Sequence, residues 1–260
     1  MTDRGCVDRV PGAPAPLPAS LTMTHLVRSG AAVIVIVAAL AATAAGLRPE
    51  LRMGAVVAVA LTAALIAALA LLLRLTGTWS FPHRRLGTCN VVTVFRGGLA
   101  CLLTMPLAAP RVAAEPEVAW AIVGVGTVAV ALDGVDGWLA RREGVASRFG
   151  ARLDMEIDAF LALVLALLAY TSGAAGAVVL VLGLARYAFA LLRLALPWLR
   201  APLPERFSRK VICVAQLSVL LLLQAPVVPD SVGGPLATLA AVLLIGSFAR
   251  DIALLSPRTR

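Results

Sequence analysis

Charged side chains are scarce in this sequence: they make up 14% of its 260 residues, against about 25% in a typical soluble protein. Hydrophobic residues make up 60%, which is more than a water-soluble core requires. This composition argues against a soluble single domain. The apolar residues are enough for roughly eight helical spans of about 20 residues each, the length that crosses a hydrocarbon core. We therefore expect most of the chain to lie in a lipid bilayer.

Cysteines are also few. The four of them (Cys6, Cys89, Cys101 and Cys213) have no CxxC spacing, and most lie near or inside apolar runs. This pattern argues against a disulfide framework and against a zinc site. We interpret these cysteines as small apolar side chains.

Apolar runs and the breakers between them predict the membrane-spanning helices. We expect eight, at residues 30–47, 53–74, 91–110, 118–140, 154–171, 176–196, 210–226 and 235–255. Residues 1–29, with VPGAPAPLPAS at their centre, are rich in proline and alanine, so we expect a disordered cytoplasmic tail there. The predicted fold is an all-α, polytopic integral membrane helical bundle.

The positive charge predicts the orientation of the bundle. The net charge is +9, which in a soluble protein would suggest nucleic-acid binding, but membrane proteins collect Lys and Arg in cytoplasmic loops. With the N-terminus inside, 19 of the 23 basic residues are cytoplasmic, three are external and Arg186 lies within a span. We therefore expect cytoplasmic N- and C-termini in a plasma membrane of prokaryotic type, and no nucleic-acid partner.

Acidic residues cluster in one part of the chain. Of the 14 in the sequence, six fall within 26 residues: Asp133, Asp136, Glu143, Asp154, Glu156 and Asp158. An Asp at the centre of a spanning helix costs about 2.5–3.5 kcal/mol on insertion scales, and less near its end. Because Asp133 and Asp136 end one apolar run and Asp154 and Asp158 open the next, we expect these four to be functional.

Helical spacing predicts which side chains share a face. One face of the first helix carries Asp133, Asp136, Gly137, Ala140 and Arg141, and one face of the next carries Gly150, Asp154 and Asp158. Two helices joined by a short cytoplasmic loop can direct four carboxylates into one site. Glu156, two residues from Asp154, is expected to point elsewhere.

The residue types in this site favour a divalent cation. Four close carboxylates repel one another unless a cation neutralises them. Oxygen ligands without His or Cys suit Mg²⁺, Mn²⁺ or Ca²⁺, and a pair of ions can bridge several carboxylates. A phosphate or pyrophosphate would share such a site, since small residues such as Gly134 and Gly137 allow close approach and Arg141 suits a phosphate.

The acidic pattern resembles the signature of the CDP-alcohol phosphotransferase (CDP-alcohol phosphatidyltransferase) family, D-x-x-D-G-x-x-A-R followed by G-x-x-x-D-x-x-x-D. Every position is present, from Asp133 to Arg141 and from Gly150 to Asp158, with the spacer 142–149 between them. A weaker pattern of the family, Asn-x-x-Thr-x-x-Arg, matches Asn90, Thr93 and Arg96.

The resemblance covers residues 88–255 and implies a six-helix catalytic core there. Residues 30–75 would then form two extra transmembrane helices outside this core. Members of the family move a phosphatidyl or related phospho-group from a CDP-linked lipid, such as CDP-diacylglycerol, to an alcohol and release CMP. The implied partners are this lipid donor, a small alcohol acceptor and membrane lipid; because members commonly form homodimers, a homodimer is expected as well.

The resemblance also implies roles for individual residues. Asp133, Asp136, Asp154 and Asp158 would bind a pair of Mg²⁺ or Mn²⁺ ions. Asp158 would be the general base that takes the proton from the acceptor hydroxyl. The CDP group would be bound by Asp133, Gly137, Ala140, Arg141 and Gly150.

The acceptor is expected to be recognised elsewhere. Arg186 lies inside a span, with Arg193 two helical turns further on, and an intramembrane Arg commonly faces a cavity. A phosphorylated acceptor such as glycerol 3-phosphate or an inositol phosphate would explain these residues. Phosphatidylglycerophosphate synthases usually carry Arg-Glu in this helix, whereas Tyr187 follows Arg186 here. The alternative for Arg193 is an ordinary cytoplasmic charge touching anionic headgroups.

Two other functions remain open at this point. An intramembrane prenyltransferase also uses Asp-rich helices with Mg²⁺, but its Asp motifs lie far apart in sequence. A cation- or proton-coupled transporter often shows internal repeats and broken helices, whereas this acidic cluster occurs once.

Overall fold

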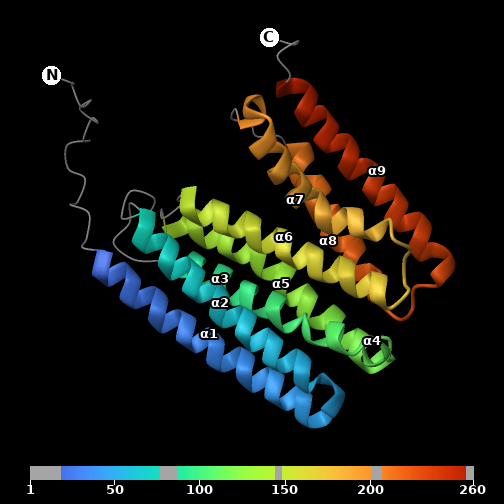
Figure 1. Ribbon diagram of the computed structural model, residues 1–260, viewed down its shortest axis with the longest axis horizontal. Helices are drawn as coiled ribbons and strands as arrows, with labels where there is room; N and C mark the ends of the chain where they lie inside the picture. The colour runs from blue at the N-terminus through green and yellow to red at the C-terminus, as the bar shows by residue number, and fades with distance from the viewer. Residues whose placement is uncertain (1–18, 77–86, 144–147, 201–206, 256–260) are drawn as a thin grey trace.

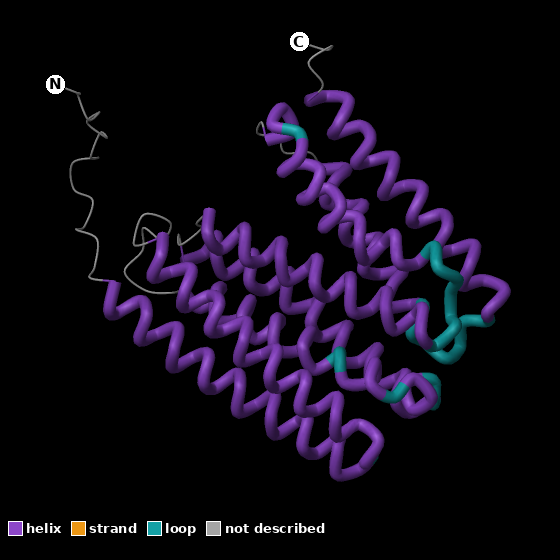
Figure 2. The backbone as a smooth tube through the Cα atoms, viewed as in Figure 1, coloured by secondary structure: helices purple, strands orange, loops and turns teal. Residues whose placement is uncertain are grey.

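The structure is a computed structural model, and it describes residues 19–76, 87–143, 148–200 and 207–255. All regular secondary structure in these residues is helical (Figures 1 and 2). The longer helices are α1 (Ala19–Leu47), α2 (Arg52–Thr76), α3 (Gly87–Leu102), α5 (Pro116–Glu143), α6 (Arg148–Thr171), α7 (Val179–Ala195), α8 (Phe207–Leu222) and α9 (Asp230–Leu255). The short ones are η1 (Pro49–Leu51), η3 (Met105–Ala108), α4 (Pro110–Ala113) and η4 (Pro197–Arg200). The chain is an all-α, polytopic membrane protein, as predicted.

The described residues include five helical stretches that are long and apolar enough to cross a membrane. These are Thr24–Leu47, Pro49–Leu72, Thr88–Ala108, Pro116–Glu143 and Ser231–Leu255; the third continues from α3 into η3. The other three expected spans fall short for two reasons. Helix α7 has 17 residues and α8 has 16, whereas a full crossing takes about 20; α6 is longer, but charged residues interrupt its first half.

Helix α1 begins earlier than expected. The tail was expected to reach residue 29, but α1 starts at Ala19. No proline interrupts the sequence between Pro18 and Pro49, so nothing breaks the helix in this stretch. Leu26 is 2% exposed and packs in one cluster with Val33, which gives this early part of the helix a buried face. Residues 1–18 lie outside the described residues.

The hairpin of α1 and α2 packs along α3 (Figure 1). Glycines allow the close approach: a Cβ on Gly98 of α3 would lie 2.7 Å from Val33 Cγ1, and one on Gly54 of α2 would lie 2.2 Å from the Met105 carbonyl oxygen. The Met105 backbone cannot move aside as the end of a flexible side chain can. The contact at Gly54 therefore has no room for even a methyl group.

Helix α6 is central to the core. Its C-terminal half is apolar and buried, with Leu161, Leu165 and Ala166 at most 1% exposed. These residues belong to one cluster with side chains from α3, α5, α7, α8 and α9. The apolar half of α6 is thereby fixed among its neighbours, while its first half, which carries Asp154 and Asp158, projects toward one end of the bundle.

The opposite end of the bundle holds most of the described loops. Figure 1 shows the turn between α1 and α2, helix α4 and the loops after α6 and α8 together at the lower right, and Figure 2 shows most of the loop segments there. At this end Arg48 lies 2.9 Å from a carboxylate oxygen of Glu115 and 2.9 Å from one of Glu117. These ion pairs join the hairpin to the beginning of α5.

Candidate active site

Arg96 of α3 lies at the centre of the acidic cluster. Its side chain is 1% exposed. The Nη1 atom lies 3.0 Å from an oxygen of Asp133, 2.9 Å from one of Asp136 and 2.6 Å from one of Asp154. The Nη2 atom lies 2.5 Å from an oxygen of Asp158. All four signature aspartates therefore converge on one guanidinium group.

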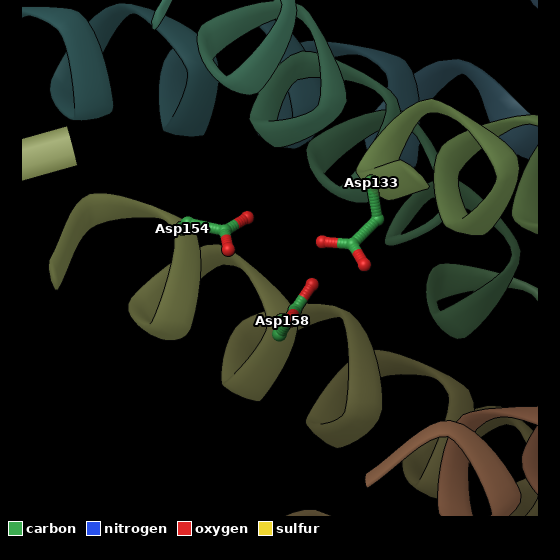
Figure 3. A group of neighbouring side chains, drawn as sticks. All are labelled: Asp133, Asp154 and Asp158. Carbon is green, nitrogen blue, oxygen red and sulfur yellow. The ribbon is translucent and has the colours of Figure 1, made fainter. Parts of the chain in front are cut away.

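The spacing of the aspartates along their helices explains this convergence. Asp133 and Asp136 are three residues apart near the end of α5, and Asp154 and Asp158 are four apart near the start of α6, so each pair lies on one face of its helix. Figure 3 shows the carboxylates of Asp154 and Asp158 directed from α6 toward Asp133 on α5. Oxygens of these three residues lie within 4.8 Å of one another.

Asp136 lies deeper than the other three aspartates. It is 5% exposed and accepts hydrogen bonds from Arg96 Nη1 and from Thr93 Oγ1, each at 2.9 Å. Arg96 also donates from Nε to the carbonyl oxygen of Ala129 at 3.0 Å. Asn90, Thr93 and Arg96 are all buried in α3, so the weaker sequence pattern marks the helix that forms the inner wall of the site.

The site carries an excess of negative charge. Four carboxylates and one guanidinium leave three formal negative charges. Asp133, Asp154 and Asp158 have side chains between 30% and 38% exposed, so their oxygens can be reached from outside. A set of carboxylate oxygens without His or Cys fits a hard cation such as Mg²⁺ or Mn²⁺. The donor set and the charge balance therefore fit the divalent ions that the sequence implies.

Four further residues expected to bind the CDP group lie on the same two helices as the aspartates. Gly137 is half-buried, and a Cβ on it would lie 3.6 Å from Arg141 Nη1, so the exposed Arg141 guanidinium lies near this glycine. Gly150 is half-buried in the first turn of α6. Ala140 is part of α5, and its side chain lies outside the described part of the structure.

The structure places Arg186 of α7 against α6. Its Nη2 atom donates to Glu156 Oε1 at 2.7 Å, and within the described residues its buried Nε atom has no hydrogen-bond partner. Glu156 faces this arginine while Asp154 and Asp158 face Arg96, as the spacing predicts. Arg193 is exposed in the last turn of α7. The structure brings the four aspartates together, and it pairs Arg186 with Glu156.

Two contacts of this site were not predicted from the sequence. The central position of Arg96 is one, although a signal was present: an Arg within the apolar run VVTVFRGGLACLL is expected to find carboxylate partners. The other is Glu143 at the end of α5, whose Oε2 atom accepts a hydrogen bond at 3.1 Å from the backbone N–H of Thr88, near the beginning of α3. Carboxylates suit the orphan N–H groups at a helix N-terminus.

The fold and the site together define an integral membrane protein whose helices gather four carboxylates at one end of the bundle. The family model described as CDP-alcohol phosphatidyltransferase matches residues 86–252. The chain belongs to this family, whose members transfer a phosphatidyl group from a CDP-alcohol to an acceptor. Neither a curated protein nor a solved structure matches the chain. The match begins at residue 86, so α1 and α2 lie outside it.

Proposed function

We propose that this protein transfers the phosphatidyl group of a CDP-diacylglycerol-type lipid to a small alcohol, with release of CMP and with Mg²⁺ or Mn²⁺ as cofactor. The observation that carries the proposal is the convergence of Asp133, Asp136, Asp154 and Asp158 on one point. These are the four aspartates of the signature, and they lie within the residues that the family model matches. The position of the cluster at one end of the bundle suits a nucleotide that is attached to a membrane lipid.

Divalent ions would be held by the four aspartates. Asp133, Asp154 and Asp158 offer oxygens within 4.8 Å of one another, and Asp136 adds a carboxylate at the inner wall. When bound, such ions polarise phosphate oxygens and offset their negative charge. Arg141 would add a guanidinium for the donor's phosphates, and the small residues Gly137, Ala140 and Gly150 would let the nucleotide approach the backbone.

Asp158 is the general base in this proposal. It accepts the proton of the acceptor hydroxyl as the hydroxyl oxygen attacks the β-phosphorus of the donor. The new P–O bond forms while the bond from that phosphorus to the bridging oxygen breaks, and CMP leaves with the electron pair. The Asp158 side chain is 30% exposed and turned toward Asp133, so an acceptor can reach it next to the other carboxylates.

The acceptor in this proposal carries a phosphate group, as glycerol 3-phosphate and inositol phosphate do. Arg186 and Arg193 supply positive charge on α7, which packs directly against α6. Binding an acceptor phosphate at Arg186 would exchange its bond to Glu156 for one to the phosphate. The expected homodimer stays a prediction.

The activity can be tested with purified protein in detergent that is supplied with CDP-diacylglycerol, Mg²⁺ and a panel of alcohols, including glycerol 3-phosphate, inositol phosphate, inositol, serine and choline. CMP release with one acceptor, abolished by EDTA, is the expected result. Asp158→Asn should lower the rate by about 10²- to 10⁴-fold, the usual contribution of a general base. Glu50→Gln, an exposed acid at the other end of the bundle, is the matched control.

Metal-independent CMP release, or full activity in Asp158→Asn, would refute this mechanism. A prenyltransferase or a transporter would release no CMP with any alcohol, so the same assay separates the alternatives.

A further inference from the structure

Arg96 is the largest side chain in the described residues that is almost completely buried. It lies within the membrane-spanning segment Thr88–Ala108. Its Nη1, Nη2 and Nε atoms are all bonded: the first two to the four aspartates and the third to the carbonyl oxygen of Ala129. Arg96 therefore supplies the positive charge at the centre of the acidic cluster.

The oxygens that Arg96 contacts belong to the residues that would hold a divalent ion. Asp133, Asp154 and Asp158 form the group whose oxygens lie within 4.8 Å of one another, and each has one oxygen within 3.0 Å of the guanidinium. Without a cation, these like charges repel one another in a site of reduced dielectric. The Arg96 guanidinium offsets part of that repulsion.

We propose that Arg96 is an internal counter-ion that preassembles the four carboxylates in the metal-free protein and competes with the divalent ion for their oxygens. The inference rests on the proposed function, because it concerns the metal site described there. In this role Arg96 is a positioning residue. A bound ion would replace part of the contacts between Arg96 and the carboxylates.

Competition of this kind predicts opposite effects on metal affinity and on metal-free stability. Removing the positive charge leaves four carboxylates without their counter-ion, so the metal-free protein is destabilised. The same change raises the negative charge of the site and removes the competitor. We expect these two effects to exceed the loss of preassembly, so that a divalent ion binds more tightly. A purely structural role for Arg96 would lower stability and leave the metal affinity of the folded protein unchanged.

The experiment measures Mn²⁺ binding to the full-length protein in detergent, without nucleotide, from the electron paramagnetic resonance signal of free Mn²⁺. Thermal unfolding is recorded in EDTA and in Mn²⁺. For Arg96→Gln we expect a Kd for Mn²⁺ at least fivefold lower than in the wild type, a lower Tm in EDTA and a larger rise in Tm with Mn²⁺. Arg152→Gln removes the same charge from an exposed position on α6, and we expect its Kd to change less than twofold.

Arg96→Lys tests the geometry separately from the charge. A single ammonium group cannot reproduce the fork of a guanidinium, so it binds fewer of the four carboxylates. We expect its Kd for Mn²⁺ to lie between those of the wild type and Arg96→Gln, and if Arg96→Gln does not fold, this variant decides the question. An unchanged or weaker Mn²⁺ affinity in the folded variants would overturn the inference. Absence of Mn²⁺ binding in the wild type would instead refute the proposed metal site itself.

Discussion

The ion pair between Arg186 and Glu156 bears on how the acceptor is recognised. The side chains are 34% and 51% exposed, and ion pairs exposed to this degree contribute about 0–1 kcal/mol. Replacing the Glu156 carboxylate by an acceptor phosphate therefore costs little free energy. The pairing observed in the structure is compatible with a role of Arg186 in acceptor binding.

Substitutions at these two positions should have opposite effects. Arg186→Ala removes the proposed phosphate ligand, and we expect it to raise the KM for a phosphorylated acceptor at least tenfold, the equivalent of about 1.4 kcal/mol. Glu156→Gln frees Arg186, and we expect it to lower the same KM severalfold. Steady-state kinetics of CMP release at saturating donor measures both. Unchanged acceptor kinetics in the two variants would remove Arg186 from the acceptor site.

The close contact between α2 and η3 should make the stability of the protein sensitive to the size of the side chain at position 54. Because a Cβ on Gly54 would meet the Met105 backbone at 2.2–2.8 Å, Gly54→Ala forces the two segments apart. We expect a loss of about 1–3 kcal/mol, typical of overpacking, seen as a lower Tm in detergent. Gly46→Ala, whose Cβ would meet nothing within 4 Å, should leave the Tm unchanged or raise it slightly. Equal effects of the two would argue against close packing of the hairpin on the core.

Local sequence features predicted some elements better than others. The long, mostly apolar sequences of α1, α2, α3, α5 and α9 indicated spans because length and composition can be read along each stretch of sequence alone. The shared face of Asp133 and Asp136 followed equally from helical periodicity. Helix α4 and η3 were not predicted, since proline-rich turns of a few residues have no periodic signal. The predicted end of the tail, at residue 29, was too late. Leu26 packs against side chains of other helices, and such contacts cannot be predicted from the local sequence.

The meeting of Arg96 with four carboxylates depends on contacts between helices. Arg96 and Asp158 are 62 residues apart in the chain, and no spacing rule relates residues on separate helices. The match of Thr93 and Arg96 to a weak pattern marked these residues without indicating their partners. Helix packing, which the sequence does not show directly, was needed to reveal the inner wall of the site.

The arrangement of the whole bundle allows a prediction of its orientation in the membrane. The beginning of α1 and the end of α9 both lie away from the end where most loops gather (Figure 1). Together with the distribution of basic residues, this favours cytoplasmic termini and a cytoplasmic active site. Arg48 and Glu50 would then be external, and Arg142 cytoplasmic.

Cysteine labelling tests this orientation in a chain whose four native cysteines are replaced by alanine. Glu50→Cys and Arg142→Cys introduce thiols at exposed positions at opposite ends of the bundle. A membrane-impermeant maleimide should label position 50 in intact cells and position 142 only after permeabilisation. The reverse pattern would invert the proposed orientation, and labelling of both positions in intact cells would contradict the separation of the two ends.

The contribution of α3 to the site determines which helices are needed to rebuild the site in another protein. The signature residues from Asp133 to Asp158 lie on α5 and α6, but the guanidinium that joins their carboxylates comes from α3, and α3 in turn rests on the α1–α2 hairpin. A fragment or a designed scaffold that copied only α5 and α6 would contain the signature residues but would lack the Arg96 guanidinium that contacts their carboxylates. The smallest unit that could be transferred to another protein therefore contains α3, α5 and α6, together with the α1–α2 hairpin that packs against α3.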